Sequence, residues 1–192
     1  MFPQLKFDRR VIRLLSGCAG FIISLLYLMV TSIYTLESGD VTMRVGVLTT
    51  SINEHSFGPS LNSLADAITY INVAPTTEWL LIPQPVEVSL GLAVNLAFVM
   101  FLINILILAH VCILTFIGTA SVARQSYTTL LVLNSVLTYF LLVEVENAVS
   151  KSTKDYGHGA SIQTASTGYT LWFAAIACIF QLWAEVIVNI QI

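Results

Sequence analysis

The chain has 192 residues, 56% of them hydrophobic and only 10% charged, and it carries a formal net charge of −3. A soluble globular domain carries about 25% charged residues because its surface faces water, so lipid must solvate much of a chain this poor in charge. Eight Lys and Arg residues in all provide no basic patch large enough to neutralise several phosphates, which argues against nucleic acid as a partner.

The first apolar stretch contains no charge between Arg13 and Glu37 and predicts a membrane span over residues 11–34, since about 20 apolar residues in a helix cross the hydrocarbon. The stretch is longer than a signal-peptide core of about 7–15 residues, so we expect no cleavage. Small residues in one stripe let another helix approach closely, whether from this chain or from a partner. Three small residues repeat at four-residue spacing here: Ser16, Gly20 and Ser24.

Residues 37–88 form the one long polar segment, which we expect to lie outside lipid. Apolar and polar residues alternate from Val41 to Leu48, which predicts a short strand with one apolar face. After the break at Gly58-Pro59, Ser60 is a candidate cap for an amphipathic helix of about three turns. The apolar residues of that helix fall at helical spacing: Leu61, Leu64, Ala65, Ile68 and Ile71.

This polar segment is interpreted as a partner surface or a lid over the helices, with a ligand-binding module as the alternative. Glu54 and His55 are adjacent, which places them on opposite faces of a strand. A zinc site needs three or four ligands, and the other His residues lie in different segments. The three cysteines fall in apolar stretches and show no disulfide or zinc spacing. We therefore expect neither a metal nor a cofactor, apart from structural lipids.

The second span is predicted over residues 89–116, because no charge lies between Glu87 and Arg124. Asn104 and His110 lie within it, and polar groups inside a membrane are functional candidates by default. A haem held across two helices needs a second axial ligand that the spans do not offer. Three asparagines are interpreted as hydrogen-bond partners between helices. They are Asn95, Asn104 and Asn134.

The third span is predicted over residues 126–145 and the fourth over residues 167–190. One stripe of the fourth span repeats at spacings of three and four: Ala174, Cys178, Gln181, Glu185 and Asn189. In one interpretation this stripe packs against other helices or a partner, and Glu185 pairs with a basic residue near the inner interface. The candidate bases are Arg9, Arg10, Arg13 and Arg124. In the other interpretation, Asn104, His110 and Glu185 line a polar path through the membrane.

Together these elements predict an all-α membrane protein: a single domain built as a four-transmembrane-helix bundle, whose first outer loop holds a short β-strand and an amphipathic helix. Basic residues gather near the N-terminus and at Arg124, so the positive-inside rule places both termini on the cytoplasmic or inner side. The loops contain no Asn-x-Ser/Thr sequon and no cysteine pair, which favours an intracellular or organellar membrane, or a loop shielded in a complex, over an extracellular surface. Both the plasma membrane and an organellar membrane stay open as the location of the chain.

The layout resembles the claudin-like tetraspan proteins, nearest to their fungal PalI type. The shared features are a short basic N-terminus, a long first outer loop with strand character, a tight inner turn and a third helix that runs on into the second outer loop. The residues that carry the last feature are Glu144–Lys151, followed by Gly159-Ala160-Ser161 and by Gly168–Trp172 before the fourth helix. The resemblance implies a scaffold or auxiliary subunit at a membrane, without catalysis.

No nucleophile–base pair, phosphate-binding loop, metal-ligand set or redox motif stands out in the sequence. The leading hypothesis is therefore a non-catalytic membrane scaffold or auxiliary subunit that stabilises or regulates a larger membrane complex, with other membrane subunits and lipids as partners. A second hypothesis is a small channel or transporter, which would be a homo-oligomer because four helices leave little room for a pore. A third is an accessory membrane subunit of an organellar respiratory complex.

Overall fold

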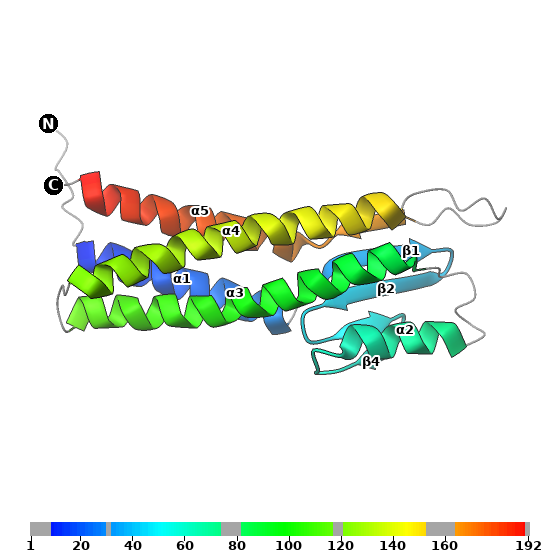
Figure 1. Ribbon diagram of the computed structural model, residues 1–192. Helices are drawn as coiled ribbons and strands as arrows, with labels where there is room; N and C mark the ends of the chain where they lie inside the picture. Colours follow the sequence, from blue (N-terminus) through cyan, green and yellow to red (C-terminus); the bar gives the residue numbers. More distant parts are fainter. Residues whose placement is uncertain (1–8, 30–31, 74–81, 117–120, 153–163, 191–192) are drawn as a thin grey trace, which may run out of the picture.

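The computed structural model describes residues 9–29, 32–73, 82–116, 121–152 and 164–190. In chain order the elements are α1 (Arg9–Met29), β1 (Ser32–Ser38), β2 (Val41–Gly46), β3 (Thr50–Ile52), β4 (His55–Phe57), α2 (Ser63–Val73), α3 (Gln84–Phe116), α4 (Ser121–Ser152), β5 (Thr164–Thr167) and α5 (Tyr169–Ile190). Figure 1 shows α1, α3, α4 and α5 side by side, with the sheet and α2 at the end away from the start of α1.

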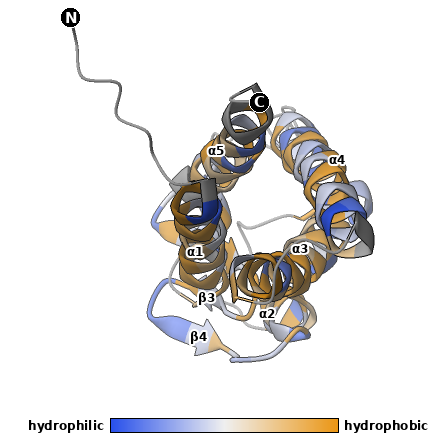
Figure 2. Ribbon diagram, turned by 90° about the vertical axis from the view of Figure 1, so that its left-hand side faces the viewer, coloured by the Kyte–Doolittle hydropathy of each residue, from blue (hydrophilic) through white to orange (hydrophobic). Residues whose placement is uncertain are grey.

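The four long helices surround a common axis when viewed along their length (Figure 2). α1 contacts α3 and α5, and α4 contacts the same two helices. Two helices, Gln84–Phe116 and Ala123–Ser152, are long and apolar enough to cross a membrane, which takes about 20 residues. The long helices therefore form one bundle in which α3 and α4 combine the length and the hydropathy of a membrane span.

The strands form one antiparallel sheet in the order β4-β3-β2-β1-β5. Residues with a positive φ occupy two of its turns, Gly39 at 57° between β1 and β2 and Asn53 at 51° between β3 and β4. Glycine and asparagine adopt this left-handed backbone most readily. β5 arrives from far along the chain and pairs with β1, where Tyr34 lies opposite Thr167. The sheet therefore joins the segment after α1 to the segment before α5.

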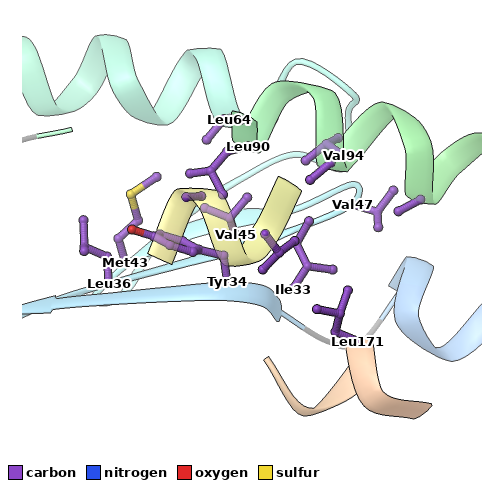
Figure 3. Packing of buried hydrophobic residues seen from close by; sticks show 14 of the residues in the cluster. Ile33, Tyr34, Leu36, Met43, Val45, Val47, Leu64, Leu90, Val94 and Leu171 are labelled. Atoms are coloured by element: carbon purple, nitrogen blue, oxygen red, sulfur yellow. The ribbon is translucent and has the colours of Figure 1, made fainter. Parts of the chain in front are cut away.

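The inner face of the sheet, α2 and the adjoining ends of the long helices share one hydrophobic core (Figure 3). Alternate residues of β2 point into this core, so Met43 and Val45 are fully buried. Leu64 of α2 and Leu90 of α3 pack into the same cluster. Burying each such side chain contributes about 1.5–3 kcal/mol. The sheet is therefore packed onto the bundle as part of the same folded unit.

Two further contacts fix the sheet to the helices. The Tyr34 hydroxyl donates to Ser152 Oγ at 2.6 Å, and Ser152 Oγ in turn donates to the Ala148 carbonyl at 2.7 Å. Burial raises the pKa of Tyr34 to about 12. At the start of α5, a Cβ on Gly168 would lie 1.6 Å from the Ser32 carbonyl oxygen. Only glycine permits this close approach of the two backbones.

The predicted fold class, an all-α bundle of four transmembrane helices, is wrong. Within the described ranges there are five helices and a five-stranded antiparallel sheet. Among the same residues, only two helices meet the length and hydropathy expected of a membrane span, and α5 contributes the shorter apolar stretch Leu171–Val186. The term tetraspan therefore does not describe this chain.

The ends of the predicted spans explain part of this error. α1 stops at Met29, and residues 32–34 of the predicted first span belong to β1, because apolar β-branched and aromatic residues satisfy a hydropathy window and also favour strands. Likewise α5 begins at Tyr169, and residue 167 is the last of β5. In contrast, α3 begins earlier than predicted, at Gln84, and α4 continues to Ser152.

The two elements predicted within residues 37–88 are confirmed as β2 and α2. The buried face of α2 differs from the predicted one, since Ala67 is buried whereas Leu61 and Ala65 are exposed. Ser60 Oγ accepts a hydrogen bond from the Asn62 amide at 3.0 Å in the turn before α2. Ser60 therefore caps that turn and does not lie at the first residue of the helix.

Candidate functional site

A partly buried ion pair joins α1 to α5. Arg13 donates to both carboxylate oxygens of Glu185, from Nη2 to Oε1 at 2.8 Å and from Nε to Oε2 at 2.9 Å. The two side chains are 13% and 9% exposed. The ion pair predicted for Glu185 is thus confirmed, with Arg13 as the base. A bidentate pair of this kind fixes the relative positions of two helices as well as neutralising both charges.

α4 contributes an aromatic ring next to this ion pair. Tyr127 is 1% exposed and packs with Val111 and Leu114 of α3. Its hydroxyl lies near Ser16, although no group in the described part of the chain meets hydrogen-bond geometry with it. Tyr127 carries no functional signal in the sequence, because a tyrosine near the start of an apolar helix is common at membrane interfaces. All four long helices therefore meet around the ion pair or one turn from it.

Next to the ion pair, three amide side chains form a chain of hydrogen bonds across the bundle. Asn104 Nδ2 donates to the Met100 carbonyl at 2.9 Å, and Gln181 Nε2 donates to Asn104 Oδ1 at 3.1 Å. Asn134 Nδ2 then donates to Gln181 Oε1 at 3.3 Å. The chain connects α3, α5 and α4 in turn. Asn104 and Asn134 therefore bond between helices, whereas Asn95 is exposed on α3.

Gly20 makes room for the amide chain on the side of α1. A Cβ at position 20 would lie 1.7 Å from Gln181 Nε2 and 3.1 Å from Asn104 Oδ1. The other two residues of the small stripe are also buried, and their hydroxyls bond to carbonyls of their own helix. Ser16 donates to Arg13 at 2.9 Å and Ser24 donates to Phe21 at 2.8 Å. The close helix approach on this stripe is thus between α1 and the rest of the same chain.

The stripe predicted on the fourth span faces the bundle interior. Its four described members, Ala174, Cys178, Gln181 and Glu185, are all buried. Cys178 Sγ donates to Ser135 Oγ of α4 at 3.2 Å. The side chain of Asn189 lies outside the described residues. The stripe therefore contacts helices of this chain, and the exposed face of α5 is the opposite, apolar one.

The structure brings together only part of the predicted polar path. Asn104 joins Gln181, and Glu185 lies one helical turn beyond Gln181, next to Arg13. His110 is separate: its Nδ1 bonds to the Leu106 carbonyl at 2.9 Å, and its side chain is half-buried. Asn104 and His110 are six positions apart on α3, so they do not share a face of the helix. His110 therefore lies away from the amide chain and the ion pair.

No group of three or more His, Cys, Asp or Glu side chains within the described ranges is arranged to hold a metal ion. His55 packs against the ring of Tyr70, with centroids 5.3 Å apart, and His158 lies outside these residues. No protein-family model matches the chain, and no curated protein sequence is significantly similar to it. The resemblance to claudin-like proteins therefore stays a prediction.

The outside of the bundle is apolar along its length. Every long helix exposes large hydrophobic side chains, and Figure 2 shows apolar residues along α1, α3 and α5. The most exposed include Leu15, Ile22, Leu26 and Met29 on α1, Leu92, Leu102, Leu106 and Phe116 on α3, Val132, Val136, Tyr139 and Phe140 on α4, and Trp172, Phe173, Ile176, Ile179 and Trp183 on α5. The exposed faces of the long helices are thus rich in large apolar side chains, while the mainly apolar interior also holds the ion pair and the three amides.

Proposed function

We propose that this chain is a non-catalytic, membrane-embedded protein that packs against other membrane subunits and stabilises or regulates their assembly. The observation that carries the proposal is the apolar exterior around an interior that holds an ion pair and three amides. In water this exterior would expose far more apolar area than the few hundred Å² of patch tolerated on soluble monomers. Lipid hydrocarbon and the apolar faces of partner helices solvate it instead.

The two ends of the bundle differ in charge, which supports an orientation. Arg10, Arg13 and Arg124 lie on the end where α1 begins. The sheet end carries mainly acidic residues: Glu37, Asp40, Glu54, Asp66 and Glu87. Because basic residues are retained on the cytoplasmic side of membranes, we propose that the arginine end faces the cytoplasm or inner compartment. The sheet and α2 then lie on the opposite side, as a folded surface for a partner.

The outer face of α5 supports a partner contact within the membrane. It exposes Trp172, Phe173, Phe180 and Trp183, which are 47–65% exposed, whereas the outer face of α3 is mainly aliphatic, with Leu102 and Leu106. Aromatic side chains are enriched at the centres of protein interfaces, and tryptophan is the most frequent energetic hot spot. We therefore propose that the outer face of α5 packs against a helix of another subunit and that the outer face of α3 contacts lipid.

The test is co-purification of the full chain from its own membrane in mild detergent, followed by native mass spectrometry. We expect a complex heavier than the 21.0 kDa chain that contains another membrane protein. The double variant Phe180→Ala/Trp183→Ala should lose the partner. Leu102→Ala/Leu106→Ala, a matched change on α3, should retain it. A stable monomer from the native membrane, with no partner under cross-linking, contradicts the proposal, and a mass that is a multiple of 21.0 kDa identifies a homo-oligomer.

The channel or transporter alternative gains no support from the described interior. Next to the amide chain lies a cavity of about 10 Å³, enough for the centre of one water molecule. Flux through proteoliposomes that does not change in Glu185→Gln and His110→Ala variants would dismiss this alternative. An accessory subunit of an organellar respiratory complex would pack against its partners in the same way but would lie in an organellar membrane. Subcellular fractionation therefore distinguishes it from the leading proposal.

A further inference from the structure

The amide chain inside the bundle has a direction, and a backbone group sets it. The Met100 carbonyl is an acceptor, so the Asn104 atom facing it at 2.9 Å has to be the Nδ2 donor. This turns Asn104 Oδ1 toward Gln181, which must present Nε2, and Gln181 Oε1 then faces Asn134, which must present Nδ2. The orientations of all three amides therefore follow from one carbonyl.

The chain ends in an acceptor that no described group satisfies. Asn134 is 2% exposed, and its Oδ1 is fully buried without a hydrogen-bond partner among the described residues. Rotating the Asn134 amide does not remove the problem, because an oxygen would then face Gln181 Oε1. A buried acceptor left unsatisfied costs about 1–3 kcal/mol. A donor is required at this one point.

A cavity of about 10 Å³ borders Asn134 and is lined by residues from all four long helices. Gly20, Asn104, Asn134, Ala177, Cys178 and Gln181 are among the residues that line it, and each of these six is buried. A cavity holds one water when it offers about 10–15 Å³ to the water centre and two to four polar partners. This volume matches one water molecule, which is also a hydrogen-bond donor.

The polar partners of such a water are already present. Each primary amide has two N–H groups, and Asn104, Gln181 and Asn134 each use one of them in the chain. A water in the cavity can donate to Asn134 Oδ1 and accept from the second N–H of Asn104, Gln181 or Asn134, all of which line the cavity, which gives the two partners that a stable buried water requires. Cys178 Sγ is a weak further acceptor on the same wall.

We infer that the cavity between Gly20, Asn134, Ala177 and Gln181 is a binding site for one water molecule, which donates to Asn134 Oδ1 and completes the amide chain. The water is a structural component of the helix interface, held at the point where α1, α3, α4 and α5 meet. This inference rests on the packing of the interior and does not depend on the proposed function or on any partner.

The test is water-selective NMR on the full chain in detergent micelles, with 15N labels on the Asn and Gln side chains. The Asn134 and Gln181 NH₂ groups should show rotating-frame cross peaks to water with the sign opposite to the diagonal, which chemical exchange does not produce. Loss of one NH₂ pair in Asn134→Leu assigns the Asn134 signal. Ala177→Val fills the cavity and leaves the amide chain intact, so the Gln181 cross peak should fall to the noise. Ala109→Val makes the same change at an exposed position of α3, and the cross peaks should keep their intensity.

Two results overturn the inference. One is the absence of water cross peaks from both NH₂ groups in the folded wild-type protein, a result that does not depend on whether any variant folds. The other is a Gln181 cross peak that keeps its wild-type intensity in Ala177→Val, because the water would then lie outside this cavity.

Discussion

Replacing Gly20 by alanine tests how the small stripe on α1 stabilises the bundle. The new Cβ would lie 1.7 Å from Nε2 and 2.8 Å from Cδ of Gln181, so the Gln181 side chain has to turn away. It then loses its bond to Asn104 Oδ1 at 3.1 Å and the bond from Asn134 Nδ2 at 3.3 Å. The amide chain is broken at its centre.

Three contributions set the change in the free energy of unfolding that Gly20→Ala causes. Each bond between membrane helices contributes about 0.6 kcal/mol, and stranding buried amides adds about 1–3 kcal/mol. Alanine in place of glycine in a helix contributes about 1 kcal/mol in the opposite direction. We therefore expect Gly20→Ala to lower the free energy of unfolding by about 1–3 kcal/mol.

The assay is reversible unfolding in mixed micelles with increasing SDS, followed by far-UV circular dichroism. Gly91→Ala is the matched control, because a Cβ on Gly91 in α3 meets nothing within 4 Å, so its stability should stay equal or rise. Combining Gly20→Ala with Gln181→Ala removes the clash, and the two changes should then cost at least about 1 kcal/mol less than the sum of the single variants. Equal stabilities of Gly20→Ala and Gly91→Ala, or strictly additive energies, would refute the reasoning.

Three further perturbations have expected outcomes, two in the same unfolding assay and one by hydrogen exchange. Glu185→Gln removes the carboxylate from the partly buried Arg13 and should lower stability by about 1.5–3 kcal/mol, most of it recovered in Arg13→Met/Glu185→Met; a loss that the double variant does not reduce would contradict this role. Tyr34→Phe loses the bond to Ser152 and should lower stability by about 0.5–1.5 kcal/mol. The folded pKa of Tyr34 is raised from 10.0 to about 12, so its stabilisation is complete below pH 10 and is lost as the pH rises through about 12. The wild type should therefore lose more stability than Tyr34→Phe between about pH 10 and 12. Gly168→Ala places a Cβ 1.6 Å from a backbone oxygen and should displace β5, seen as faster hydrogen exchange in β1; unchanged exchange would show that the backbones separate without cost.

The local patterns of the sequence predicted the elements best where one physical signal dominated. The alternation from Val41 predicted β2, and the break at Gly58-Pro59 marked the approach to α2. The charge complementarity of Glu185 with the N-terminal arginines was also readable, because a carboxylate on a buried stripe requires a counter-charge. Choosing Arg13 among four bases required the geometry.

The error in fold class came from signals that carry two meanings. Ile33 and Tyr34 continue the uncharged stretch that begins in the first helix, yet both are buried residues of the strand β1. The segment 164–167 is too short and too polar to predict a strand from its sequence, and its place in the sheet depends on pairing with β1. Such long-range pairing is not encoded in a local window. The amide chain had a partial signal in its asparagines, but its direction depends on the Met100 carbonyl.

The pairing of β5 with β1 has a consequence for how the chain is made. β1 ends at Ser38, whereas β5 begins at Thr164, so more than a hundred residues are synthesised before the β1 edge is covered. At roughly 5–20 residues per second on the ribosome, this edge stays open for on the order of ten seconds. An open edge is a template for pairing with other strands. During synthesis, β1 therefore needs a temporary partner or shield, and a truncation before residue 164 should aggregate where the complete chain does not.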